Sequence, residues 1–152
     1  MSALKERINQ EMKAALLGGD RFRGDVLRNL KAVILNEEVA QNKREEGLAD
    51  AEIEKLIARE VKKRQESVAL YKQNDRKDLA DTEEQELAIL KDYLPEQLSE
   101  DDLMKITEEV IADMGEVSPQ QMGQVIGAVK AKVGSAADGA IIAQVVKQAL
   151  TK

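Results

Sequence analysis

The feature that most constrains the fold is the spacing of the apolar residues, which return every three or four positions along nearly the whole chain. This period places them on one face of an α-helix. The alternating pattern of a half-buried β-strand does not occur in the sequence. Short apolar runs at 140–142 and 145–146 resemble strands, but helical spacing and nearby capping residues favour helix there. We therefore expect an all-α protein.

Four apolar stripes occupy the first 94 residues, separated by residues that stop or start helices. In chain order these residues are Gly18-Gly19, Asp20 or Asp25, the polar stretch 41–47, Asp50, Asn74-Asp75 and Pro95. Asp50 is expected to cap the third helix. Pro95 is expected to end the fourth, because proline disfavours helical backbone in the residue before it. Residues 1–94 are thus predicted to form an N-terminal four-helix unit of long helical hairpins.

Three further stripes follow Pro95. Ser99, the run Ser118-Pro119-Gln120-Gln121 and Asp138 are the expected helix starts, and Gly115 and Gly134 are the expected stops. The first of these stripes predicts a buried row made of Leu103, Ile106, Val110, Ile111 and Met114. Residues 95–152 are predicted to form a small three-helix domain.

The composition excludes several kinds of chemistry. The chain contains no Cys and no His, which removes disulfides, Cys/His zinc sites and Ser-His or Cys-His catalytic pairs. Phe22, Tyr71 and Tyr93 are the only aromatic residues, so stacking platforms for single-stranded nucleic acid are nearly absent. We assign no catalytic residue and expect no cofactor and no metal.

The location is predicted from what the sequence lacks. The first residues include acids and do not form an apolar run of signal-peptide length. No 18 consecutive apolar residues occur, so no membrane contact is expected. We predict a cytoplasmic protein.

Charge is unevenly distributed along this chain of net charge −6. Residues 95–117 hold one basic and eight acidic side chains, whereas residues 118–152 hold four basic and one acidic. The candidate contact site for the phosphates of a folded RNA, or for a protein partner, is the set Lys130, Lys132, Gln144, Lys147 and Gln148. The alternative is a solvated face with lysines placed favourably at helix C-terminal ends.

Two features made of small residues have competing interpretations. The turn 134–139 could bring backbone N–H groups to a phosphate. A tight turn capped by Asp138 is the favoured interpretation, because an aspartate there would repel phosphate. Gly123 and Gly127 have the spacing of close helix packing, which we favour over a docking site.

The charged runs are interpreted as surface. Lys62-Lys63-Arg64 and Arg59 are expected to spread around a helix axis instead of forming one patch. The acidic runs could bind Mg²⁺ or supply an acid and a base, but a solvated or first-turn role is favoured. These runs are Glu37-Glu38, Glu83-Glu84-Glu86 and Glu100-Asp101-Asp102.

The chain resembles the GatB/YqeY family over essentially its whole length, and in particular the stand-alone bacterial YqeY-like proteins. The residues that carry the resemblance are Leu27-Arg28, Asn36-Glu37-Glu38, Tyr93 to Leu98, Met122-Gly123, Val125-Ile126-Gly127, Lys130, Gly134, Ala137-Asp138-Gly139, Val145-Val146-Lys147 and Leu150. The sequence departs from the family at Ala136, where a basic residue is common.

The resemblance implies a link to carbon–nitrogen ligases that use glutamine as amide donor, because the same tail occurs in the GatB subunit of tRNA-dependent amidotransferases. The full reaction needs a catalytic cradle and an amidase subunit that do not fit in 152 residues. The leading hypothesis is therefore a binding module for tRNA or a tRNA-handling enzyme, with the hairpins of residues 1–94 as a second contact surface. The alternatives are a protein–protein adaptor without RNA affinity and an accessory amidotransferase subunit.

Overall fold

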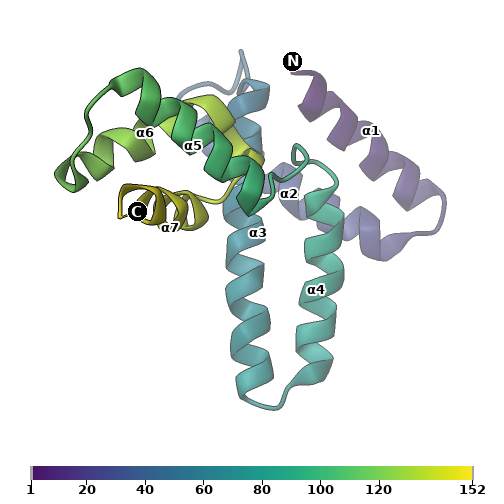
Figure 1. Cartoon of the computed structure of the whole chain (residues 1–152). Coiled ribbons are helices and arrows are strands. Elements are labelled where there is room, and N and C mark those ends of the chain that lie inside the picture. Colours follow the sequence, from purple (N-terminus) through teal and green to yellow (C-terminus); the bar gives the residue numbers. More distant parts are fainter. Residues whose placement is uncertain (1, 152) are drawn as a thin grey trace. The chain divides into compact units, whose positions relative to one another are not determined.

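The computed structural model describes residues 2–151; residues 1 and 152, the outer ends of the two predicted domains, lie outside it. Within the described residues the protein is all-α, with seven α-helices and no strand (Figure 1). The predicted fold class is thus confirmed. The chain divides into two compact units, Met1–Leu94 and Pro95–Lys152, called unit 1 and unit 2 below.

Unit 1 consists of two helical hairpins. Helices α1 (Ala3–Leu17) and α2 (Arg21–Ala40) form the first, and α3 (Asp50–Gln73) and α4 (Lys77–Lys91) form the second (Figure 1). Side chains from all four helices and from the loop before α3 bury one aliphatic cluster, as the apolar stripes predict. Its members are Ile8, Val26, Leu27, Leu30, Ile34, Leu48, Ile53, Leu56, Ile57, Val61, Leu90 and Tyr93.

Of the capping residues predicted for unit 1, Asp20 caps its helix and Asp50 does not. The Asp20 carboxylate accepts the Arg23 backbone N–H at 3.1 Å, as expected of a cap. Asp50, however, is the first residue of α3 and does not cap it. Its Oδ1 atom instead accepts the backbone N–H of Leu4 in the first turn of α1, at 3.2 Å. That N–H has no acceptor within its own helix, so the aspartate compensates a distant helix end.

The hairpin of α3 and α4 is unevenly packed along its length. The buried residues of α3 all lie in its first half, from Ile53 to Val61. Beyond them, Val68 and Tyr71 are only half-buried. Helix α4 ends at Lys91, four residues before Pro95 and earlier than predicted.

Unit 2 contains α5 (Glu100–Met114), α6 (Met122–Val133) and α7 (Gly139–Leu150), with short 3₁₀ turns at Pro119–Gln121 and Gly134–Ala136. The Ser99 hydroxyl accepts the Asp102 N–H at 3.1 Å, and the Asp138 carboxylate accepts the Ala140 N–H at 2.9 Å, so both predicted caps are confirmed. Gly115 and Gly134 follow α5 and α6 with φ of 83° and 55°, values that favour glycine.

Unit 2 has its own aliphatic cluster. Its buried members are Leu103, Val110, Val125, Val129, Ile142, Val145 and Val146. Met114, predicted to belong to the buried row of α5, is 37% exposed because α5 ends at this residue. No helix within residues 2–151 is long and apolar enough to cross a bilayer.

Candidate functional site

Three of the five candidate contact residues share one face of α7. Gln144, Lys147 and Gln148 are exposed and lie within about 100° of one another around the helix axis, given 3.6 residues per turn. Ala140 and Ile141 extend this face toward the start of α7, and Ile141 is 40% exposed. The solvent side of α7 is therefore a small surface with amide, cationic and aliphatic groups, which we call the α7 face.

Lys130 and Lys132 lie on α6 and do not form one patch with each other. They are two positions apart, which places their side chains about 160° apart around the axis. The Lys130 side chain passes over the first turn of α7: its Cε and Nζ atoms lie 3.4 Å from the position that a Cβ on Gly139 would occupy. Across the described part of the chain, Lys130, Lys132 and Lys147 form no ion pair or side-chain hydrogen bond.

The turn at 134–139 has the structural role that we favoured. Asp138 holds the Ala140 N–H at the start of α7, so that donor is occupied. The carbonyl groups of Ser135 and Ala136 accept hydrogen bonds from the Gln97 side chain at 3.0 Å and the Leu98 backbone at 2.8 Å. Within unit 2, this turn therefore ties the segment before α5 to the connection between α6 and α7.

The packing interpretation of Gly123 and Gly127 is wrong. Both glycines are exposed, and a Cβ added to either would meet no atom within 4 Å among the described residues. Glycine is about 1 kcal/mol less favourable than alanine inside a helix, so the open side of α6 carries a cost that its own packing does not explain.

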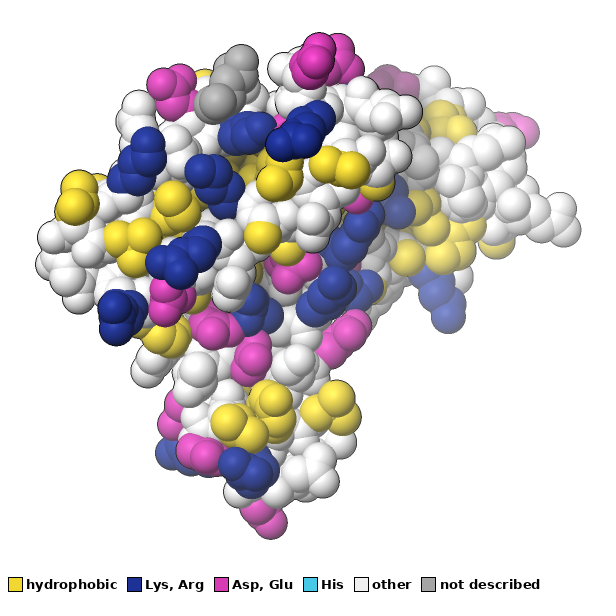
Figure 2. All heavy atoms as spheres, turned by 180° about the vertical axis from the view of Figure 1, so that it is seen from behind, with side chains coloured by type: hydrophobic (Ala, Val, Ile, Leu, Met, Phe, Trp, Pro, Cys, Tyr) yellow, Lys and Arg dark blue, Asp and Glu magenta, His cyan; other side chains and the backbone are white. Residues whose placement is uncertain are grey.

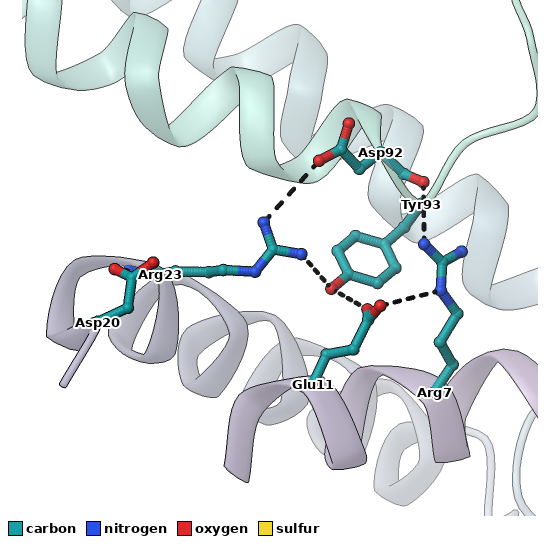
Figure 3. Close-up of polar contacts among 6 residues, drawn as sticks. All are labelled: Arg7, Glu11, Asp20, Arg23, Asp92 and Tyr93. Atoms are coloured by element: carbon teal, nitrogen blue, oxygen red, sulfur yellow. Dashed lines mark hydrogen bonds and ion pairs between the residues drawn. The ribbon is translucent and has the colours of Figure 1, made fainter. Parts of the chain in front are cut away.

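A polar cluster at the end of α4 was not predicted from the sequence (Figure 3). Tyr93 is 3% exposed, and its hydroxyl donates to the Glu11 carboxylate of α1. The Arg23 guanidinium of α2 donates to the same hydroxyl at 3.0 Å. Arg7 lies over the tyrosine ring at 4.6 Å from its centroid and donates to the Asp92 carbonyl at 3.5 Å (Figure 3). Two helices, α1 and α2, thus hold the residues directly before Pro95.

The environment of Tyr93 suits a structural donor. Burial, together with the hydrogen bond to Glu11, raises the pKa of the Tyr93 hydroxyl to about 12, although Arg23 opposes this shift. The phenol therefore stays protonated near neutral pH and donates to Glu11. An activated tyrosine base would need a lowered pKa, so this cluster is suited to positioning the end of α4.

The pair Glu37-Glu38 does not act as one unit, and Glu38 is fully buried, contrary to the expectation of a solvated run. Lys5 donates to both Glu38 carboxylate oxygens at 2.8 Å, and the Leu48 N–H adds a third bond at 3.1 Å. Glu37 instead accepts from Gln41 at 2.7 Å. Glu38 thus fixes the loop between α2 and α3 onto α1.

The acidic run of α4 is likewise paired. Arg64 of α3 contacts both Glu83 and Glu86, and Lys72 contacts Glu84 at 2.9 Å. Burial raises the pKa of the Glu86 carboxyl, and the Arg64 charge opposes this shift. Glu100, Asp101 and Asp102 lie in the first turn of α5, as expected. Within residues 2–151, no group of three or more acidic side chains is arranged to hold a metal ion.

The hairpin of α1 and α2 exposes apolar as well as basic side chains. Figure 2 shows dark-blue and yellow side chains interspersed over the side of unit 1 that α1 and α2 form. Leu35 and Val39, one turn apart on α2, are 44% and 54% exposed. Val39 also lines a pocket with Asn42, Arg44, Glu45 and Glu46.

Comparison with known proteins gives one family. A family model described as "Yqey-like protein" matches residues 5–150. The chain is similar to a protein of Kluyveromyces lactis named "Altered inheritance of mitochondria protein 41, mitochondrial", with 27% identity over 124 residues that cover 79% of this chain and 65% of that protein. Proteins of the same name from Lachancea thermotolerans and Vanderwaltozyma polyspora are 31% and 28% identical to this chain. Each alignment covers 57% of this chain and 46% of the relative.

Proposed function

This chain belongs to the YqeY-like family, and from that premise we propose that it is a binding module for tRNA or for a tRNA-handling enzyme. It spans less than two thirds of the length of the curated relatives described above, so their activities remain separate from this proposal. The contact surface is in unit 2. We also propose the cytoplasmic location that the sequence predicts. The mitochondrial location is part of the names of the yeast relatives and is not transferred to this chain.

The observation that carries the proposal is the unpaired state of three exposed lysines in an acidic chain. Lys130, Lys132 and Lys147 reach solvent without an acidic partner among residues 2–151. Lysine contacts with phosphates supply affinity that depends on salt and little on base sequence. Gln144 and Gln148 flank Lys147 and can hydrogen-bond to phosphate or sugar oxygens.

The five candidate residues lie on two helices, so their contributions to binding can be tested separately. The α7 face presents Lys147 beside two amide side chains, whereas Lys132 projects from α6 on a different side from Lys130. We expect the α7 face and Lys130 to contribute most of the contact, since Lys130 approaches the start of the same helix. Lys132 then provides a charge-matched control in the same unit.

The test is binding of bulk tRNA across a salt series. The variants are Lys130→Ala/Lys132→Ala/Lys147→Ala, Lys147→Ala alone and Lys132→Ala alone. Binding by the wild type that weakens with salt, and that Lys147→Ala reduces more than Lys132→Ala does, supports the proposal. No tRNA binding at low salt contradicts the RNA part of it.

A protein–protein adaptor is the second candidate, favoured by exposed aliphatic residues such as Leu35 and Val39 on α2 and Ile141 on α7. Co-purification of a protein partner without RNA, abolished by Leu35→Ser/Val39→Ser, would favour it. An accessory role in an amidotransferase predicts glutamine-dependent amidation that appears only when this chain is added to the other subunits.

A further inference from the structure

We propose that the solvent face of α3 binds the backbone phosphates of duplex RNA through Lys55, Arg59 and Lys62. These three residues are called the α3 stripe. The inference rests on the proposed function and deepens it, because it assigns RNA contacts to unit 1. Unit 2 supplies the lysines considered above.

The three cations share one side of one helix. Their spacing of four and three residues places them within about 60° around the axis and roughly 10 Å apart along it. All three residues are exposed, whereas the buried positions Ile53, Ile57 and Val61 occupy the opposite side. Of the run Lys62-Lys63-Arg64, only Lys62 belongs to the stripe, so the run as a whole does not form one patch.

What distinguishes the α3 stripe is that its charges are unpaired. Further along α3, Lys63 pairs with Glu60 at 3.4 Å, Arg64 with Glu83 and Glu86, and Lys72 with Glu84. The three stripe residues have no such partner in the part of the chain that the structure describes. Two acids lie on the same face. Glu52, three residues before Lys55, pairs with Lys43 at 3.2 Å, and Glu66, one turn beyond Lys62, is not within ion-pair distance of it.

Like charges three or four residues apart on a helix repel each other and destabilise it. The repulsion within the α3 stripe is not relieved inside the chain. A polyanion bound along the helix would relieve it, because each cation would then face a phosphate.

The surroundings of the α3 stripe favour duplex RNA over other polyanions. Ala51 and Ala58 are its apolar neighbours, so it lacks the large side chains that insert a helix into a membrane surface. It also lacks aromatic residues, on which single-stranded bases would stack. A duplex presents phosphates in a regular row and is recognised by shape and backbone.

The test uses the full chain and a duplex RNA of about 20 base pairs, at 50 to 200 mM salt. The test variant is Lys55→Gln/Arg59→Gln/Lys62→Gln. The control, Lys63→Gln/Lys72→Gln/Arg76→Gln, removes the same net charge from cations that are already paired with acids. We apply the value for duplex DNA, in which each phosphate contact adds about 0.9 to the magnitude of the slope of log affinity against log salt. Three contacts therefore predict that wild-type affinity falls about 40-fold more than that of the test variant over this range.

Several outcomes would overturn the inference. Equal losses in the two triple variants would show that only net charge matters. Absence of duplex binding by the wild type at 50 mM salt, or equally tight binding of poly-glutamate, would exclude a duplex-RNA surface. The single Arg59→Gln variant, with an expected slope change of about 0.9, provides the test if the triple variant does not fold. A tRNA affinity that falls in the unit 2 lysine variant but not in the α3 variant would leave the proposed function intact and reject this inference.

Discussion

Replacing Gly127 by alanine should stabilise the protein. Gly127 lies in the middle of α6 with its Cα toward solvent, and an added Cβ would meet no described atom within 4 Å. No packing is gained or lost, so the expected effect is the intrinsic difference between glycine and alanine in a helix interior. That difference is about 0.8–1 kcal/mol in favour of alanine.

The assay is calorimetric unfolding of the full chain. A gain of about 1 kcal/mol corresponds to a rise of roughly 4–8 °C in the melting temperature of a domain about as large as unit 2. Gly123→Ala should have the same sign with a smaller effect, because Gly123 lies in the first turn of α6. Gly127 and Ser99 both belong to unit 2. The calorimetric transition whose midpoint rises in Gly127→Ala should therefore be the one whose midpoint falls in Ser99→Ala.

A matched control is available in α2. The same substitution at Gly24 would place a Cβ 2.4 Å from Cδ2 and 2.7 Å from Cγ of Leu16 on α1, so that side chain must move. Overpacking costs typically 1–3 kcal/mol, which exceeds the helix gain, and Gly24→Ala should lower stability by up to about 2 kcal/mol. A lowered melting temperature for Gly127→Ala would refute the reasoning, because the face of α6 would then be in contact with something in solution.

Three further predictions concern the polar contacts. Glu38→Gln should lower the free energy of unfolding by about 3 kcal/mol, seen as a lower urea midpoint, because the Lys5 charge loses its buried partner. Ser99→Ala should cost about 1 kcal/mol through loss of the α5 cap. The raised pKa of Tyr93 means that its share of stability is complete below pH 10 and is lost as pH rises toward 12. Absorbance at 295 nm should show an ionisation step near pH 12, and Tyr93→Phe should remove that step.

Helix existence and most helix boundaries could be predicted from the sequence because they depend on local signals. Ser99, Asp138 and Gly134 act on atoms within four residues of themselves, and all three predictions are confirmed. Asp50 shows where such reasoning fails. Its carboxylate has the sequence context of a cap for α3, but a donor 46 positions earlier occupies it. Tertiary contacts of this kind leave no local pattern.

The candidate site was predictable only in part for the same reason. Spacing alone shows that Gln144, Lys147 and Gln148 share one face of α7. Spacing does not show which face of α6 is buried, and the packing role predicted for Gly123 and Gly127 was therefore wrong. The cluster around Tyr93 joins residues up to 86 positions apart. An aromatic residue between Asp92 and Pro95 is its one sequence signal, and nothing in the sequence selects Glu11 or Arg23 as partners.

Because the α3–α4 hairpin is packed unevenly, its base should be locally more stable than its outer part. Its base is anchored in the aliphatic cluster, whereas its outer part is held by half-buried side chains and by ion pairs such as Lys72 with Glu84. Amide hydrogens near the turn at Asn74 and Asp75 should therefore exchange with deuterium by local fraying, well before those around Ile57, which require global opening. The same turn should be the first site cut in limited proteolysis, with the two fragments remaining associated through the base of the hairpin.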